Sequence, residues 1–276
     1  MNITIITPSY NAEKTIEKTI LSILRQKDGN VQYIIIDGAS TDKTLEIIYK
    51  YKKDIDIIIS EKDKGIADAY NKGIALATGD LIVIIAADDQ LINHALAKII
   101  NEYDGHSDII CGNVIDYNGE RYIRRYSDAN LKNLTFQTSL MHPATFIKRE
   151  AYLKYGTYSL QYKCAIDRDL FLRFYKIGAS FQIVDIDISF FKNGRGISTE
   201  NPCKYAYPED AQISIKNGTS IWIAKSYQYK AVVLYYISLF IKRFLKILHL
   251  SYYFNKRMVN KGYYVANDQI NKFDLL

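Results

Sequence analysis

Two neighbouring carboxylates, Asp88 and Asp89, follow a strongly apolar run of the sequence and could bind a metal ion. Carboxylate oxygens are the ligands that a hard divalent cation prefers, and such a cation can share its coordination with a diphosphate. Two more polar segments follow apolar runs, Thr-Pro-Ser-Tyr-Asn at 7–11 and Asp-Gly-Ala-Ser-Thr-Asp at 37–42. A flat aromatic ring and a carboxylate suit a nucleobase and its ring N–H. Together the three segments predict a pocket for a nucleotide diphosphate.

Each of these segments, taken alone, also fits an ordinary structural role. Pro8 and Tyr10 could belong to a loop with a core aromatic residue, and Asp-Gly at 37–38 is a common turn signal. The pair Asp88 and Asp89 could cap a helix and favour its dipole. Their joint occurrence after three apolar runs favours the nucleotide pocket.

The elements that must position these residues alternate between strands and helices. The expected strands are 3–7, 33–36, 55–59 and 81–86, and the expected helices are 12–26, 42–51 and 66–77. This order with short connections predicts an α/β fold, with a Rossmann-like, mostly parallel sheet flanked by helices. Its strands end at one edge, where open α/β sheets bind ligands. Beyond residue 90 the pattern loosens to expected strands at 109–115, 121–126 and 181–188 and a helix at 168–175.

The composition is that of a globular protein, with 276 residues, 48% hydrophobic and 24% charged. Three widely spaced cysteines without a CxxC pair argue against a disulfide framework or a zinc site. The first residues also lack the pattern of a secretory signal. These features predict a cytoplasmic protein.

The three polar segments and the Lys-Gly-Ile-Ala-Asp-Ala-Tyr-Asn-Lys-Gly segment at 64–73 resemble family-2 glycosyltransferases. Their nucleotide-sugar domain is called the GT-A fold, and the similarity is greatest to the bacterial subgroup that makes surface polysaccharides. The resemblance covers about residues 1–200, with the motifs in the family's order. It implies an inverting transfer from a nucleotide-diphosphate sugar.

The resemblance assigns roles in the donor pocket. Thr7, Pro8 and Tyr10 would line the base pocket. Asp37 would accept a hydrogen bond from the base, which is usually uracil in such enzymes. Asp68 would border the sugar diphosphate.

Asn71 would border the sugar diphosphate as well. Asp88 and Asp89 match the family's metal motif, with Asp89 as the expected direct ligand. The metal would be Mn²⁺ or Mg²⁺, which neutralises the departing diphosphate.

A catalytic base is expected at the start of the helix near 168–175, where the segment at 165–173 resembles the family's base-bearing segment. Asp167 is the first choice and Asp169 the second, although both could simply cap that helix and favour its dipole. Ile166 stands where many relatives have Glu, so the local acidic pair is incomplete. His142 could bind the acceptor or a phosphate, or could be a structural histidine. Arg195 could reach the diphosphate, or could be a solvated loop residue.

We expect a catalytic domain at 1–207 and a separate C-terminal segment at 208–276. This segment is basic and aromatic. Between 211 and 267 there are nine Lys or Arg and no Asp or Glu. The apolar run 231–241 is too short to span a membrane and predicts an amphipathic helix. Such a helix favours an anionic membrane interface, and packing on the catalytic domain or in a homodimer is the alternative. No motif indicates nucleic-acid binding.

The leading hypothesis is therefore transfer of a hexose or N-acetylhexosamine from a UDP-sugar to a saccharide hydroxyl. The acceptor would be a lipid-linked cell-surface glycan, and the enzyme would lie on the cytoplasmic face of the inner membrane. The alternatives are a sugar-1-phosphate nucleotidyltransferase and a non-catalytic nucleotide-sugar-binding protein. The segment at 7–11 lacks the Gly-rich basic loop of a nucleotidyltransferase. It also lacks the GxGxxG motif of a dehydrogenase. The paired acids at 88–89 argue against a non-catalytic binding protein.

Overall fold

The computed structural model describes residues 1–117, 122–192 and 201–247. The strands are β1 (Ile3–Ser9), β2 (Val31–Asp37), β3 (Ile57–Ser60), β4 (Leu81–Ile84), β5 (Gln90–Leu91), β6 (Ile109–Tyr117), β7 (Tyr122–Arg125), β8 (Thr145–Lys148) and β9 (Phe181–Lys192). The helices are α1 (Ile16–Leu24), α2 (Thr44–Lys50), α3 (Ile66–Leu76), α4 (Ala95–Glu102), α5 (Arg149–Tyr155), α6 (Ile166–Lys176), α8 (Ala206–Lys216) and α9 (Ile221–Ile247), with short 3₁₀ helices η1 (Leu131–Thr135) and η2 (His142–Ala144).

One sheet joins the strands of the described residues in the order β3-β2-β1-β4-β8-β6-β9-β5, with β7 paired to β6. The four strands β3, β2, β1 and β4 are parallel, as predicted. β8 then runs antiparallel to both β4 and β6, while β6 and β9 are parallel to each other. The half of the sheet that precedes residue 90 is therefore parallel, and the second half is mixed.

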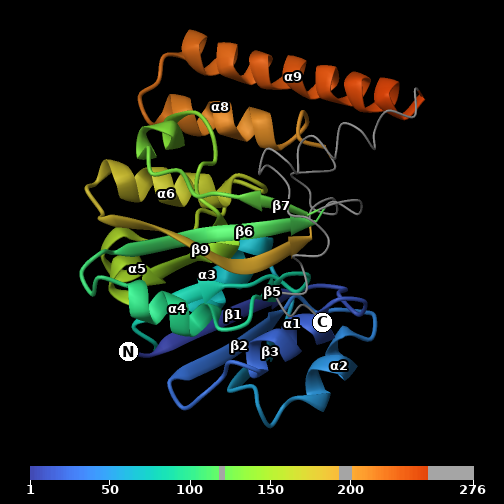
Figure 1. Cartoon of the computed structure of the whole chain (residues 1–276), viewed down its shortest axis with the longest axis vertical. Helices are drawn as coiled ribbons and strands as arrows, with labels where there is room; N and C mark the ends of the chain where they lie inside the picture. The colour runs from blue at the N-terminus through green and yellow to red at the C-terminus, as the bar shows by residue number, and fades with distance from the viewer. Residues whose placement is uncertain (118–121, 193–200, 248–276) are drawn as a thin grey trace.

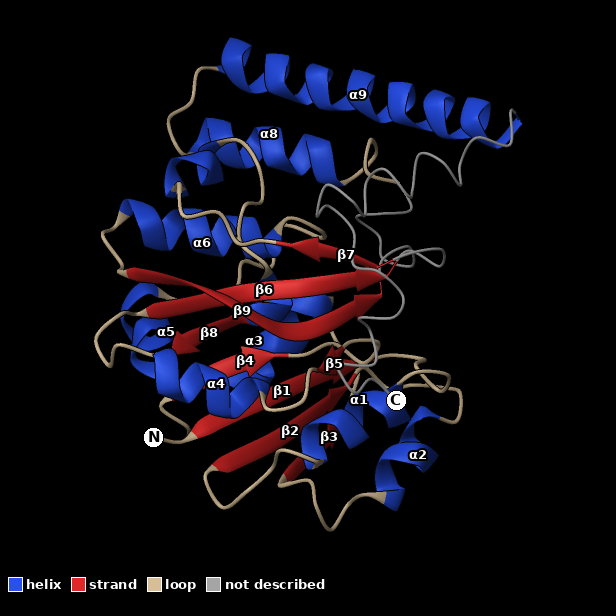
Figure 2. Ribbon diagram, in the orientation of Figure 1, coloured by secondary structure: helices blue, strands red, loops and turns tan. Residues whose placement is uncertain are grey.

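Each face of the sheet has its own core, because successive side chains of a strand point to opposite faces. In β2, Ile34 and Ile36 pack in the core with α3 and α6, whereas Tyr33 and Ile35 pack in the core with α1 and α2. Helices therefore cover both faces (Figure 2). This double burial explains why the strands are almost continuously apolar.

The helices α6, α8 and α9 form successive layers beside the sheet, with α9 outermost along α8 (Figure 1). The expected boundary after residue 207 falls inside α8, whose Ile213 belongs to the core with α6. α9 begins at Ile221, well before the apolar run that predicted it. Within the described residues, no helix is both long enough and apolar enough to cross a bilayer.

The elements of the second half that were not predicted include β5, β8, α4 and α5. They are short and lie among loops, so their sequence periods are weak. Arg195 and the tail beyond residue 247 lie outside the described residues.

Candidate active site

The loops that follow β1 and β2 are joined by hydrogen bonds between side chains and backbone. The Asn11 side-chain oxygen accepts from the Thr41 amide at 2.9 Å, and the Asn11 amide donates to Ser40 Oγ at 2.9 Å. The Ala12 amide donates to Thr44 Oγ1 at 2.7 Å. Asn11 itself has a φ of 48°, a left-handed conformation that Asn tolerates better than most residues. The two loops therefore form a single surface at the carboxyl edge of the sheet.

Asp37 lies at the centre of this edge and is fully buried. Its Oδ1 accepts from Ser9 Oγ at 3.0 Å and Ser40 Oγ at 2.5 Å. Its Oδ2 accepts from the Ser40 amide at 2.9 Å and from Ser60 Oγ at 2.8 Å. The sequence predicted direct contact between this carboxylate and a base. In the structure the carboxylate instead binds the ends of β1, β2 and β3 together and presents no surface to a ligand.

Replacing Asp37 by alanine should lower the free energy of unfolding by about 2 kcal/mol, because buried hydroxyl donors lose their acceptor. It should also weaken nucleotide binding, since the loops after β1 and β2 lose their common anchor. Denaturant unfolding and calorimetry measure the two effects. Asp28→Ala, at an exposed carboxylate before β2, is the control and should change stability by less than about 0.5 kcal/mol. Equal stability of the two variants would contradict the anchoring role.

Tyr10, Gly38 and Asp63 lie together on the outer side of this edge. The Tyr10 side chain is 65% exposed. A Cβ atom placed on Gly38 would stand 2.9 Å from Asp63 Oδ2 and 3.4 Å from Tyr10 Cδ2. The lack of a side chain at Gly38 thus lets an exposed ring and a carboxylate approach each other. Asp63 was missed in the sequence because no period or motif sets it apart from its charged neighbours.

Thr7 and Pro8, the other two expected base-pocket residues, are buried within β1. The hydroxyl of Thr7 accepts a hydrogen bond from the Tyr33 hydroxyl at 3.3 Å. Of the three residues expected to line the base pocket, Tyr10 alone is exposed. Thr7 and Pro8 support the strand from which Tyr10 projects.

Lys72 of α3 forms ion pairs with three acidic residues beside this surface. Its ammonium lies 2.8 Å from Glu61, 2.7 Å from Asp63 and 3.5 Å from Asp68. Hydrogen bonds to Asp63 and Glu61 raise the pKa of Lys72 above its ordinary value, so it stays charged. Asp68 also accepts from the Lys64 amide at 3.0 Å, which, with the charge of Lys72, holds its pKa low. Asp68 is therefore an ionised first-turn residue of α3.

Asn71, expected beside the sugar diphosphate, is used in a backbone clamp. Its side-chain amide donates to the Tyr158 carbonyl at 2.9 Å, and its side-chain oxygen accepts from the Tyr158 amide at 3.0 Å. The Tyr158 hydroxyl in turn lies 2.8 Å from His142 Nε2. Burial lowers the pKa of His142 to about 4, so this imidazole is neutral near pH 7. The clamp fixes the segment that leads into α6.

Tyr70 of α3 is buried within range of the charges of the candidate metal ligands and of the candidate base. Its buried ring stacks on His142 with ring centroids 5.4 Å apart. The pKa of Tyr70 is raised first by burial and then by the negative charges of Asp167, Asp89 and Asp88. The charges of all three carboxylates therefore act on one side chain, although Asp167 is far from the other two in sequence.

Asp167 and Asp169 occupy different environments in the first turn of α6. Asp167 is half-buried, and its Oδ1 accepts from the Arg168 amide at 2.7 Å. Burial raises the pKa of Asp167 to about 6. Asp169 is almost fully buried, and its Oδ2 accepts from Arg173 Nε at 2.9 Å. Asp167 is thus the more accessible carboxylate, with a pKa near that of a useful general base.

The turn that carries Asp167 is held by α8. The Glu209 carboxylate accepts from the amides of Lys163, Cys164 and Ala165, each at 2.9 Å, which precede the first turn of α6. Of these amides, that of Ala165 belongs to the N-cap of α6, and a carboxylate at a helix start is favoured by the helix dipole. The fully buried guanidinium of Arg168 donates to the backbone and side chain of Asp210.

The same guanidinium makes three further hydrogen bonds. Nε donates to Leu134 O at 3.0 Å, and Nη2 donates to Thr135 O at 2.6 Å and Ser214 Oγ at 2.7 Å. With the two bonds to Asp210, Arg168 uses its full set of N–H donors. It therefore ties α6 to both η1 and α8.

The donor set at the end of β4 fits a divalent cation that is shared with a ligand. Asp88 is half-buried and Asp89 almost fully buried, in a turn closed by the bond from the Asp89 amide to Ala86 O at 2.9 Å. No group of three or more His, Cys, Asp or Glu side chains placed to hold a metal occurs in the part of the chain that the structure describes. Two carboxylates that need phosphate oxygens to complete the coordination suit Mg²⁺ or Mn²⁺.

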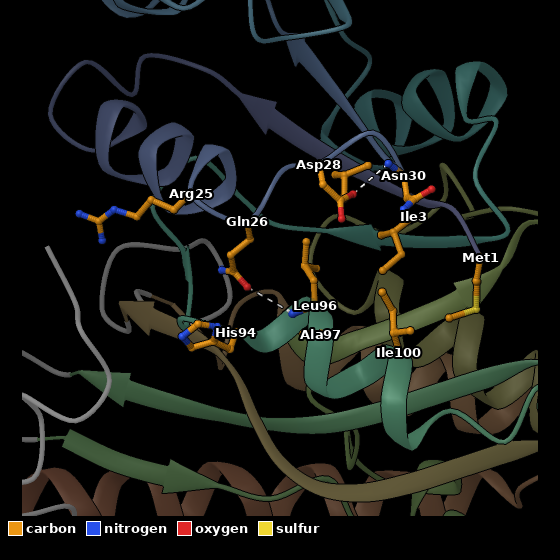
Figure 3. Close-up of a pocket in the computed structure, with 11 residues that line it drawn as sticks. Met1, Ile3, Arg25, Gln26, Asp28, Asn30, His94, Leu96, Ala97 and Ile100 are labelled. Carbon is orange, nitrogen blue, oxygen red and sulfur yellow. Dashed lines mark hydrogen bonds between the residues drawn. The ribbon is translucent and has the colours of Figure 1, made fainter.

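A separate cavity of about 210 Å³ lies at the opposite end of the parallel strands (Figure 3). Ile3 and Val31, the first residues of β1 and β2, line it, as do Gln26 and Leu96. Gln26 Oε1 accepts from the Leu96 amide at 3.3 Å across it. The cavity is therefore remote from the carboxyl edge where Tyr10 and Asp37 lie.

Comparison with solved structures shows the GT-A glycosyltransferase fold. S. aureus TarS (residues 1–349) in complex with UDP-GlcNAc matches with a TM-score of 0.64 and 17% identity, over 83% of this chain and 70% of that one. The mannosyltransferase PcManGT from Pyrobaculum calidifontis, in complex with GDP-Man and Mn²⁺, matches with a TM-score of 0.62 and 19% identity, over 82% and 69%.

The model of glycosyl transferase family 2 matches residues 4–171. The chain belongs to this family of enzymes. A PGL/p-HBAD biosynthesis glycosyltransferase of Mycobacterium tuberculosis is 32% identical over 176 residues, which cover 61% of this chain and 68% of that protein. TuaG of Bacillus subtilis, assigned to teichuronic acid biosynthesis, is 36% identical over 99 residues, or 35% and 39% of the two chains.

Proposed function

We propose that this enzyme transfers a hexose or N-acetylhexosamine from a UDP-sugar to a saccharide hydroxyl, with inversion at the sugar C1. The observation that carries the proposal is that the charges of Asp88, Asp89 and Asp167 all act on the buried Tyr70, while Asp167 is only half-buried in the first turn of α6. Two neighbouring carboxylates that could hold a metal ion and a separate half-buried carboxylate are the groups needed to release a diphosphate and to activate a hydroxyl.

In the proposed step, the Asp167 carboxylate takes the proton of the acceptor hydroxyl as its oxygen attacks C1. The new C1–O bond forms on one face of the sugar while the bond from C1 to the diphosphate oxygen breaks on the other. UDP leaves and the proton stays on Asp167. A divalent cation held by Asp88 and Asp89 would neutralise the charge that develops on the diphosphate.

The donor base would lie against the exposed Tyr10 ring, beside Gly38 and Asp63. A carboxylate next to an open aromatic surface suits the ring N–H of uracil. TarS was solved with UDP-GlcNAc, which supports a uridine donor, and PcManGT was solved with GDP-Man, which makes guanosine the competing choice.

The acceptor is proposed to be a lipid-linked cell-surface glycan. This proposal is supported by the names of the relatives, which place them in the biosynthesis of PGL/p-HBAD and of teichuronic acid.

Calorimetry with UDP, with and without Mn²⁺, tests the donor site. Wild type should bind UDP only when metal is present, and Asp89→Asn should weaken metal-dependent binding at least about tenfold. Asp54→Asn, at an exposed carboxylate in the loop before β3, is the matched control and should bind as wild type does. Metal-dependent binding of GDP in place of UDP would refute the uridine assignment.

Turnover separates the alternative functions. A transferase releases UDP from a UDP-sugar when a saccharide acceptor is added, whereas a nucleotidyltransferase releases pyrophosphate from UTP and a sugar 1-phosphate. Metal-dependent UDP binding without either product would identify a nucleotide-sugar-binding protein.

A further inference from the structure

The helix α9 packs on the rest of the protein along one narrow stripe. Its buried or half-buried positions include Ala224, Gln228, Ala231, Tyr235 and Ser238, spaced four and three residues apart. This spacing is that of a helix that packs along one face. The main partner is α8, where the rings of Tyr207 and Tyr235 meet edge to face at 6.5 Å. The Tyr227 ring also stacks on Phe136, just after η1, at 4.3 Å.

The opposite side of α9 is an exposed aromatic and aliphatic ridge, called here the outer ridge. Its residues are Trp222, Tyr229, Val233, Tyr236, Phe240 and Phe244. The Trp222 side chain is 82% exposed and that of Phe240 is 70% exposed. A continuous apolar surface on a water-soluble helix generally marks an interaction site.

Positive charge flanks the outer ridge. Lys225 and Arg243 are exposed and lie on one flank, in line with each other because five turns of 3.6 residues separate them. Lys230 is exposed on the other flank. The sequence of α9 contains five Lys or Arg and no Asp or Glu. The ridge is therefore bordered by cations without an acid on the same helix to neutralise them.

This charge pattern distinguishes between two occupants of the ridge. In a helix pair formed by two copies of α9, cations would face cations, and no carboxylate of either helix could form the interhelical ion pairs that stabilise such pairs. Anionic lipid headgroups instead complement both flanks. Trp and Tyr also favour the boundary between headgroups and acyl chains, where an apolar ring and a polar tip are both accommodated.

We propose that α9 docks on an anionic lipid bilayer, lying in the plane of the interface with the outer ridge toward the acyl chains and Lys225, Lys230 and Arg243 toward the headgroups. The proposal rests on α9 alone and is independent of the donor and acceptor proposed above.

Sedimentation of the full chain with vesicles tests the docking. The protein should bind phosphatidylcholine vesicles that contain phosphatidylglycerol, and hardly bind vesicles of phosphatidylcholine alone. High salt should weaken the binding because it screens the headgroup charge. Removing the charge of Lys225 or Lys230 by substitution with Gln should weaken binding about fivefold for each charge.

A matched pair of variants tests the outer ridge itself. Phe240→Ser should weaken vesicle binding at least about tenfold, whereas Leu153→Ser, at a 73% exposed position on α5, should leave it unchanged. Circular dichroism of each variant checks that α9 remains helical. If Phe240→Ser loses helicity, the docking is tested instead by comparing wild-type binding to vesicles with and without phosphatidylglycerol.

Two results would overturn the proposal. One is absence of wild-type binding to anionic vesicles, or equal binding to both vesicle types. The other is a stable wild-type dimer in light scattering that Phe240→Ser converts to monomer, since a second copy of the chain would then cover the ridge.

Discussion

Asp167→Asn is expected to lower kcat by about 100- to 10,000-fold, the range that a positioned general base contributes. The amide keeps the size of the side chain and the contact with the Arg168 amide but cannot take a proton. UDP binding in the presence of Mn²⁺ should remain as in wild type, because Asp167 is assigned to the acceptor side. Steady-state kinetics and calorimetry on the same preparation separate the two effects.

The pH dependence gives this prediction a second measurement. The pKa of Asp167 is raised to about 6, so the carboxylate is ionised above that pH and protonated below it. Wild-type kcat/KM should therefore fall as pH drops through about 6, and the residual activity of Asp167→Asn should lack that step. Because the raised pKa means that burial disfavours the charged carboxylate, removal of the charge should not lower stability near pH 7.

Asp169→Asn is the control for the base. Asp169 pairs with Arg173 inside α6, so its loss should reduce stability and leave the acidic limb of the pH profile in place. If Asp169→Asn abolished that limb while Asp167→Asn retained turnover, the base assignment would be reversed.

Arg168→Met should destabilise the protein by about 4 kcal/mol, which is the effect of removing one partner from a buried ion pair. Methionine fills part of the space but leaves the Leu134 carbonyl and the Asp210 carboxylate without the guanidinium donor. The Thr135 carbonyl loses one of two donors, since Ser214 Oγ still donates to it. Burial already raises the pKa of Asp210 to about 6, so this acid depends on the neighbouring guanidinium to stay ionised. Urea unfolding at neutral pH measures the loss.

The comparison for this variant is Arg25→Met, at an exposed arginine after α1. It should change the free energy of unfolding by less than about 0.5 kcal/mol. An equally small change for Arg168→Met would mean that the contacts among α6, η1 and α8 contribute little to the folded state.

The parallel half of the fold was predictable because its signals are local. The strand 3–7 and the helix with Ile16, Ile20 and Ile23 on one face follow from side-chain periods, and polar residues after each strand indicated the binding edge. The mixed half was less predictable, since its elements are held by contacts between distant residues. The bond between Arg168 and Asp210 joins positions 42 apart in sequence, and no periodic pattern marks it.

The site shows the same division. The Asp-Gly dipeptide at 37–38 indicated an important position, but the sequence could not say whether the carboxylate faces a ligand or the protein. The hydroxyls of Ser9, Ser40 and Ser60 all donate to this carboxylate. These serines are far apart in sequence and become neighbours only after folding. The importance of Gly38 likewise depends on Asp63, which approaches it from the loop after β3.

The contacts of α8 with α6 also bear on how far this enzyme can be shortened. The region shared with family 2 ends at residue 171, whereas Glu209, Asp210 and Ser214, which hold the turn around Asp167, come later in the chain. A fragment trimmed to the shared region would keep the proposed base and lose its support. We therefore expect the smallest unit that folds and acts alone to extend at least to the end of α8, and chimaeras with other family members should exchange α6 and α8 together.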